Sequence, residues 1–212
     1  MIKQICILTK SYKDNGYCVA GIDIENGQWV RLVPTEDNDD KIPKYYMDKS
    51  YNFIDILDVV EVDLIKHIPK NCQTENYLID LHIPLKIIDR LSLNEVLDIK
   101  HYDDVSTIFG NRGKAITPYD AESLKYSLLL LPVKELSFNL VYDEENYKWI
   151  KKDLSFIYNH YKYELPITDP EYKKIEHNGK FFNEGIIVLS IPAEPYNNWH
   201  NKFVAKIFLI NT

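Results

Sequence analysis

The sequence predicts a mainly β protein with a barrel or sandwich architecture. Roughly ten short apolar or alternating runs are separated by turn residues about every 8 to 12 positions, and only two short segments have a helical pattern. The chain contains 16 Tyr, eight Phe and three Trp against seven Gly and two Met, a composition that suits half-buried pleated strands. Its 212 residues fit one elaborated domain or two compact subdomains. Two small barrels would divide near residue 134, giving parts 1–134 and 135–212.

Four strands are predicted in the first hundred residues. Residues 2–10 are apolar at both alternating sets of positions, as in a strand that is buried on both faces. Residues 17–24 and 29–34 flank Asn26-Gly27, a pair that readily adopts positive φ, so they form a hairpin. Residues 57–68 alternate apolar and acidic side chains, which predicts a strand with one solvated face.

Two short helices are predicted between the strands. Ser92 and Glu95 have the spacing of a capping box and predict a helix over 92–99. Thr117 before Pro118 predicts a second helix start. The polar stretch after residue 34 predicts a loosely packed loop anchored by Tyr45-Tyr46. The remaining predicted strands are 127–133, 136–145, a pair around a turn at Asn159-His160, 185–195 and 202–210.

Composition excludes several classes of protein. A net charge of −7 and a pI near 5.4 argue against a protein that coats nucleic acid by charge alone. Three cysteines without a CxxC pair, and histidines without ligand spacing, predict no metal site. The chain lacks a phosphate loop, HExxH, GxSxG and GxGxxG, and we expect no cofactor. Without a signal peptide or an apolar run of about 20 residues, we expect a cytoplasmic protein with no membrane contact.

The run Gln73-Thr74-Glu75-Asn76 is the strongest candidate for a site. Its amide, hydroxyl and carboxylate groups would present both donors and acceptors to one planar ligand. The alternative is a loop that satisfies its own backbone, because Thr and Asn readily bond to local N–H groups. The residues alone leave both interpretations open.

Weaker candidates are spread along the chain. Thr168-Asp169 precedes Pro170, so an extended backbone would aim the carboxylate into a cleft, although Asp before Pro is also a common turn former. Trp199 is placed to stack on a base. Lys10, Arg31 and Lys202 stand at predicted strand ends, where a cation would grip a phosphate or simply be solvated.

Five motifs occur in order along the chain: Cys18 to Gly21, Trp29 to Arg31, Gln73 to Asn76, Thr168 to Pro170 and the terminal strand that begins at Lys202. Together they resemble a bacterial family known as the dual OB-containing domain. The resemblance runs nearly from end to end. It has two departures: Cys72 stands where the family often has His, and Leu32 stands where Pro commonly follows the Trp-x-Arg step.

The resemblance implies two OB-like barrels packed together with a few short helices. OB barrels typically bind single-stranded nucleic acid or oligosaccharide on an open sheet face. The family also suggests a component of prokaryotic nucleic-acid processing or of defence loci. The candidate ligand-binding residues are Lys10, Arg31, Gln73, Thr74, Glu75, Asn76, Thr168, Asp169 and Lys202.

Three hypotheses follow for function. The first is a recognition module for nucleic acid or a nucleotide, with Lys10 and Arg31 on phosphate and the run 73–76 on a base edge. The second is an enzyme on a nucleotide-like substrate that uses Glu75 and Asp169 as a carboxylate pair. The third is a protein-interaction subunit that docks a partner through the acidic segment 36–63 or through an exposed sheet edge. The run 73–76 also fits a polar clasp that locks the two barrels together.

Overall fold

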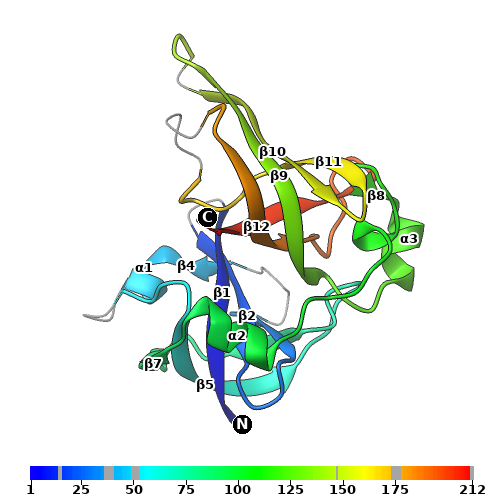
Figure 1. The fold of residues 1–212 in the computed structure, drawn as a ribbon. Coiled ribbons are helices and arrows are strands. Elements are labelled where there is room, and N and C mark those ends of the chain that lie inside the picture. Colours follow the sequence, from blue (N-terminus) through cyan, green and yellow to red (C-terminus); the bar gives the residue numbers. More distant parts are fainter. Residues whose placement is uncertain (14–15, 36–40, 49–52, 147, 173–177, 211–212) are drawn as a thin grey trace. The chain divides into compact units, whose positions relative to one another are not determined.

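The computed structural model describes residues 1–13, 16–35, 41–48, 53–146, 148–172 and 178–210. Contacts divide the chain into two units, Met1–His101 and Tyr102–Thr212. Each unit is built mainly from strands, as the sequence predicts (Figure 1).

The described residues of the first unit form seven strands and two short helices. Its elements are β1 (Ile2–Lys13), β2 (Gly16–Asp23), β3 (Trp29–Val33), β4 (Ile42–Pro43), α1 (Lys44–Asp48), β5 (Asp58–His67), β6 (Asn76–Ile79), β7 (Lys86–Arg90) and α2 (Leu93–Ile99).

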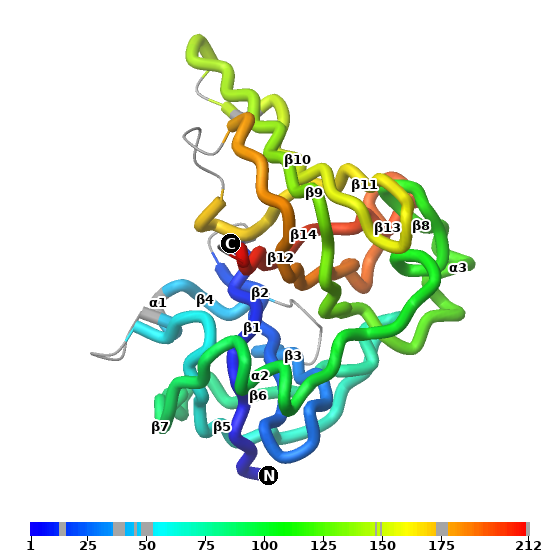
Figure 2. The backbone as a smooth tube through the Cα atoms, viewed as in Figure 1, coloured from blue at the N-terminus to red at the C-terminus, as the bar shows by residue number. Residues whose placement is uncertain are grey.

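Five of these strands close into a barrel. The sheet order is β1-β2-β3-β6-β5, and β5 pairs back onto β1 with Ile5 opposite Val60. All of these pairs are antiparallel except β3 with β6, which is parallel. This parallel pair links strands from distant parts of the sequence, and without it the barrel would remain an open sheet. Figure 2 traces the same path through the backbone.

The interior of the first barrel is apolar. Alternate residues of β1, β2, β3 and β5 share one buried cluster, as the period of a strand requires. The segment predicted as a loosely packed loop instead forms β4 and α1, and it contributes Ile42, Tyr46 and Met47 to this cluster. For residues 41–48 the loop prediction was wrong, because three apolar side chains of this polar stretch pack into the core, among them Tyr46, one of the two expected anchors. Residues 36–40 of the predicted loop lie outside the described residues. The predicted caps of α2, Ser92 and Glu95, are confirmed.

The described residues of the second unit form further strands and short helical segments. Its elements are η1 (a 3₁₀ turn, Ile108–Gly110), β8 (Ala115–Ile116), α3 (Pro118–Ser123), β9 (Leu128–Asp143), β10 (Lys148–Tyr158), β11 (Tyr161–Pro166), β12 (Phe181–Ser190), β13 (His200–Asn201) and β14 (Phe203–Leu209).

The second unit repeats the strand order of the first. Its sheet runs β11-β10-β9-β12-β14, and a parallel bridge between Ile167 and Val204 joins the two edge strands. The antiparallel strands β9 and β10 continue as a two-stranded arm beyond the residues that pair with β11 and β12 (Figure 1). Phe156 and Tyr163 stack inside, with ring centroids 5.7 Å apart.

The boundary between the units lies earlier than the expected division near residue 134. Residue 134 falls inside β9, which continues through Pro132 to Asp143. The segment before β9 belongs to the second unit because it bonds within it. The backbone N–H of Asp103 donates to Leu130 O over 3.0 Å, and β8 pairs with β13.

Candidate functional site

Arg31, Gln73, Glu75 and Asn76 come together in the first barrel, and we call them the first-barrel cluster. A tight turn holds the run in place, because Lys70 and Gln73 exchange two backbone hydrogen bonds of 3.0 and 2.9 Å. The chain then enters β6 at Asn76, which lies opposite Arg31 in the parallel pair. The cluster therefore lies where β3 and β6 close the barrel.

Side chains in the cluster bond to one another. The guanidinium of Arg31 donates to Glu75 Oε1 from two nitrogens, over 3.2 and 3.4 Å. The amide of Asn76 donates to Gln73 Oε1 over 3.1 Å. All four side chains are buried, with at most 7% exposed. An ion pair and an amide pair thus occupy a water-poor site.

The pKa of the Cys72 thiol reflects burial and charge in the first-barrel cluster. Burial, followed by the negative charge of Glu75, raises the pKa of the Cys72 thiol to about 11. Cys72 is therefore a neutral, buried side chain at neutral pH. Thr74 is only half-buried, and its carbonyl lies 2.6 Å from His67 Nε2.

Lys10 is buried in β1, where its ammonium contacts a backbone carbonyl and an aromatic ring. Its ammonium donates to Ile54 O over 2.7 Å and lies 3.7 Å from the centroid of the Phe53 ring. Only 6% of Lys10 is exposed, so neither it nor Arg31 presents a cation at the surface.

Thr168 and Asp169 lie in the second unit, where β11 meets β14. The Thr168 backbone N–H donates to Val204 O over 2.9 Å. The carboxylate of Asp169 accepts from the N–H of Ile207 at 3.0 Å and pairs with Lys206 at 3.2 Å. Burial raises the pKa of Asp169, against the opposing effect of Lys206. These residues join the edges of the second barrel, as the first-barrel cluster does in the first.

Lys202 is fully buried just before β14. Its ammonium donates to Ile108 O at 2.6 Å, to Asn111 O at 2.8 Å and to Asn111 Oδ1 at 2.6 Å. Burial lowers the pKa of Lys202 to about 8. Its three donors tie the η1 segment to the start of β14.

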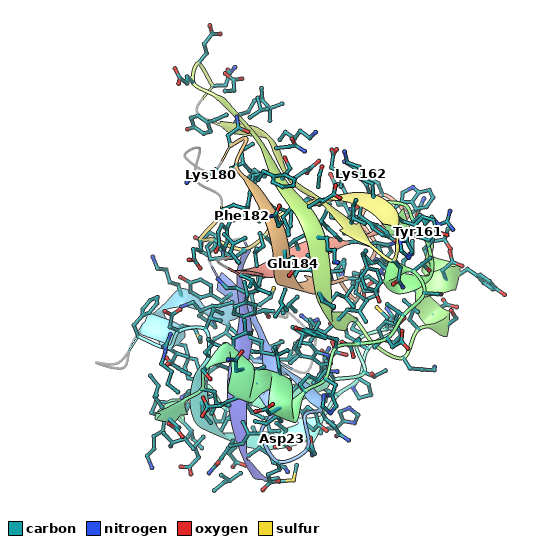
Figure 3. All side chains as sticks on the ribbon, viewed as in Figure 1. Asp23, Tyr161, Lys162, Lys180, Phe182 and Glu184 are labelled. Atoms are coloured by element: carbon teal, nitrogen blue, oxygen red, sulfur yellow. The ribbon has the colours of Figure 1, made fainter. Side chains whose placement is uncertain are left out.

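A group of exposed or half-exposed cations lies on β10, β11 and the loop before β8, and sequence reasoning missed it. Lys114 bonds to Asp153 at 3.0 Å and to Glu164 at 3.1 Å, and Lys151 bonds to Glu164 at 2.8 Å. The hydrogen bonds from Lys151 and Lys114 lower the pKa of Glu164 to about 2. Lys162 is exposed at the start of β11, next to Tyr161 (Figure 3).

Arg112 lies against Tyr161, with its guanidinium carbon 3.3 Å from the ring centroid. Within the described residues, no ion pair involves Arg112 or Lys162. We call the cations Arg112, Lys114, Lys151 and Lys162 the second-barrel face. The signal that would have found it is the alternation in Tyr161–Pro166, which puts Lys162 and Glu164 on the outward side of a buried strand.

The described residues contain neither a metal cluster nor a membrane span. No group of three or more His, Cys, Asp or Glu within them is arranged to hold a metal ion. Their helices are too short and too polar to cross a bilayer.

The fold and the comparisons agree on the class of protein. Five strands in the order first-second-third-fifth-fourth, with the third and fifth parallel, define an OB barrel, and both units have this order. The model of the dual OB-containing domain family matches residues 3–207, and the chain belongs to that family. A search of curated proteins finds no match.

Proposed function

We propose that the protein binds single-stranded nucleic acid through the second-barrel face. One observation carries the proposal: OB barrels bind oligonucleotides across their second and third strands, and in the second barrel these strands are basic and partly exposed. Residues 148–166 contain four Lys against two carboxylates. Lys162 and Arg112 are the cations best placed for phosphate, because no carboxylate of the described residues pairs with them.

The first barrel supports the same proposal by contrast. Its second and third strands, β2 and β3, are buried at every position except Cys18 and Trp29, which are half-buried. Residues 16–33 contain one Arg against two carboxylates. We expected Arg31 and Lys10 to hold phosphate, but both side chains are buried. We therefore propose phosphate binding for the second barrel instead.

The other two hypotheses gain no comparable support. Glu75 and Asp169 each lie in an ion pair within their own unit, with Arg31 and Lys206, which does not favour acid/base chemistry. Of the acidic segment proposed to dock a protein, residues 36–40 and 49–52 lie outside the described residues. A role in prokaryotic nucleic-acid processing or defence stays a prediction from the family.

Fluorescence anisotropy with labelled single-stranded DNA and RNA of about 12 nucleotides, a length within OB site sizes, tests the proposal. We expect binding at about 50 mM salt that weakens as salt rises. The double variant Arg112→Gln/Lys162→Gln should reduce the slope of log affinity against log salt by about 0.7 for each lost phosphate contact. Lys86→Gln is the matched control, since Lys86 is an exposed first-barrel lysine. No binding by the wild type at low salt would overturn the proposal.

A further inference from the structure

Three large aromatic side chains are exposed in one region of the second unit. Tyr119 is 83% exposed, Tyr196 71% and Trp199 48%. Trp199 directly precedes His200, which pairs with Ile116 in the β8–β13 ladder, and Tyr119 follows Ile116 by only three positions. The ladder therefore brings two distant segments, and their aromatic side chains, into one neighbourhood.

Residues 196–199 form a tight two-residue hairpin, which we call the aromatic turn. The N–H of Tyr196 donates to Trp199 O over 2.9 Å, and the N–H of Trp199 donates to Tyr196 O over 3.0 Å. Asn197 and Asn198 have φ values of 49° and 64°, as a type I′ turn requires and as Asn tolerates. Residues that exchange both bonds point their side chains to the same face, so Tyr196 and Trp199 form one platform.

The aromatic turn is held firmly at both sides. The ring of His200 is buried, and its Nδ1 lies 2.8 Å from Pro192 O, which ties the end of the connection to its beginning. Lys202, three residues after the turn, is fixed by its three hydrogen bonds to Ile108 and Asn111. Because both ends of the turn are fixed, less conformational entropy is lost when a ligand binds.

Core packing does not account for these aromatic residues. An aromatic side chain contributes to stability mainly by burying its ring, and Tyr196 and Trp199 leave most or half of theirs in water. The turn itself needs only the two Asn residues. The rings of Tyr196 and Trp199 are therefore available to contact a ligand with a flat, apolar face.

We propose that the aromatic turn stacks an unpaired base of the nucleic acid whose phosphates contact the second-barrel face, an inference that rests on the proposed function. The turn lies in the connection between the fourth and fifth strands of the barrel, β12 and β14, a loop that OB modules use for oligonucleotides. Base stacking on aromatic rings is tolerant of sequence, so this subsite selects for unpaired bases and against duplex.

The neighbouring cations identify the ligand as a nucleic acid instead of a neutral sugar. The N–H of Lys202 donates to Lys114 O over 2.9 Å, which attaches the strand leaving the turn to the loop that carries Arg112 and Lys114. Arg112 in turn covers Tyr161. The path from the aromatic turn to the second-barrel face thus passes two cationic side chains, Arg112 and Lys114.

The experiment compares two probes of equal charge, a dT oligonucleotide of about 12 nucleotides and an abasic deoxyribose-phosphate chain of the same length. The variants are Tyr196→Ala and Trp199→Ala. Phe181→Ala is the matched control, because Phe181 is 57% exposed in the same unit but lies on β12 opposite Ser137. Thermal unfolding verifies that each variant is folded.

We expect each turn variant to lose about 10-fold in affinity for the dT probe, equivalent to about 1.4 kcal/mol, with no change for the abasic probe. Trp199→Phe should retain part of the affinity, since a smaller ring still stacks. Equal binding of the dT probe by wild type and by both turn variants would overturn the inference and leave the proposed function standing. A wild type that binds neither probe would overturn both.

Discussion

The two barrels have the same strand order but differ in what their second and third strands present. In the first barrel β2 and β3 are almost wholly buried, and the one guanidinium between them, that of Arg31, is neutralised by Glu75. In the second barrel the outward positions of β11 are exposed or half-exposed, and Lys162 stands without an acidic partner among the described residues. One topology therefore supports two different surfaces.

The barrels also close by different chemistry at the same topological point. The third and fifth strands of the first barrel are joined by an internal ion pair between Arg31 and Glu75. In the second barrel the corresponding join uses a backbone hydrogen bond from Thr168 to Val204, with Asp169 paired to Lys206 beside it. Both sequence motifs, Gln73 to Asn76 and Thr168-Asp169, lie where a barrel closes. An unusual polar run in a sequence can therefore mark the point of barrel closure.

The largest expected effect comes from Gly21→Ala, which breaks the first barrel alone. A Cβ at Gly21 would lie 2.0 Å from the carbonyl oxygen of Cys6, a backbone atom of the neighbouring strand. We expect a loss of more than about 4 kcal/mol in the free energy of unfolding, measured by urea denaturation. Gly185→Ala in the second barrel is the control. Its Cβ would lie 3.0 Å from the flexible end of Leu136 and 3.1 Å from the carbonyl oxygen of Phe208, a milder approach than 2.0 Å. An equal loss there would contradict the assignment.

Arg31→Met tests whether the first-barrel cluster is a closure or a ligand site. Removing the cation leaves Glu75 buried without its ion-pair partner, which should destabilise the protein by about 3–5 kcal/mol. Adding Glu75→Leu should restore most of that loss. Urea denaturation of the single and double variants measures both. A single variant that keeps its stability but loses affinity for oligonucleotides would mean that the cluster binds a ligand.

Lys202→Met tests how the buried Lys202 of the second barrel makes the free energy of unfolding depend on pH. The pKa of Lys202 is lowered to about 8 from 10.5, so the unfolded chain binds the proton more tightly. The stability contributed by this shift is fully present above pH 10.5 and is lost as pH falls through 8. The free energy of unfolding of the wild type, minus that of the variant, should rise by about 3 kcal/mol across this range. Urea titrations of both proteins measure it, and a flat difference would refute the burial of a charged Lys202.

Local sequence signals predicted much of the fold. Strand alternation located β1, β2, β3 and β5, and the capping box placed Ser92 at the N-cap of α2. The division into units was harder, because Pro132 gave the appearance of a strand end. The strand β10 does not reach Pro132, so this position lies at a sheet edge, where a missing N–H is tolerated.

The candidate site was less predictable than the fold. The sequence singled out Gln73 to Asn76 as unusual. Whether these side chains are exposed depends on a parallel strand pair that brings Arg31 to Glu75, which is 44 positions away in the sequence. Likewise nothing local indicates that Lys202 is buried by a loop 91 residues earlier. Trp199 is the exception, since a polar turn around an aromatic residue is visible in the sequence itself.

The smallest expected effect, and the most direct test of the difference between the two barrels, comes from Glu164→Gln. Glu164 holds Lys151 and Lys114 with one oxygen, at 2.8 and 3.1 Å. Its pKa of about 2 keeps it charged at any working pH. Removing that charge should release Lys151 to phosphate and loosen Lys114, which keeps its bond to Asp153 at 3.0 Å. We expect oligonucleotide affinity at low salt to rise by roughly 3- to 10-fold, with a steeper salt dependence.

Glu184→Gln separates this local effect from a general change in net charge. Glu184 is half exposed and lies 3.8 Å from Lys134, a looser pair on the same unit. Both variants remove one negative charge, so screening by salt acts on them alike. Anisotropy titrations should show a larger gain for Glu164→Gln than for Glu184→Gln. Equal gains would mean that nucleic acid responds only to the charge of the whole protein, and that β10 and β11 are no better suited to phosphate than the buried strands of the first barrel.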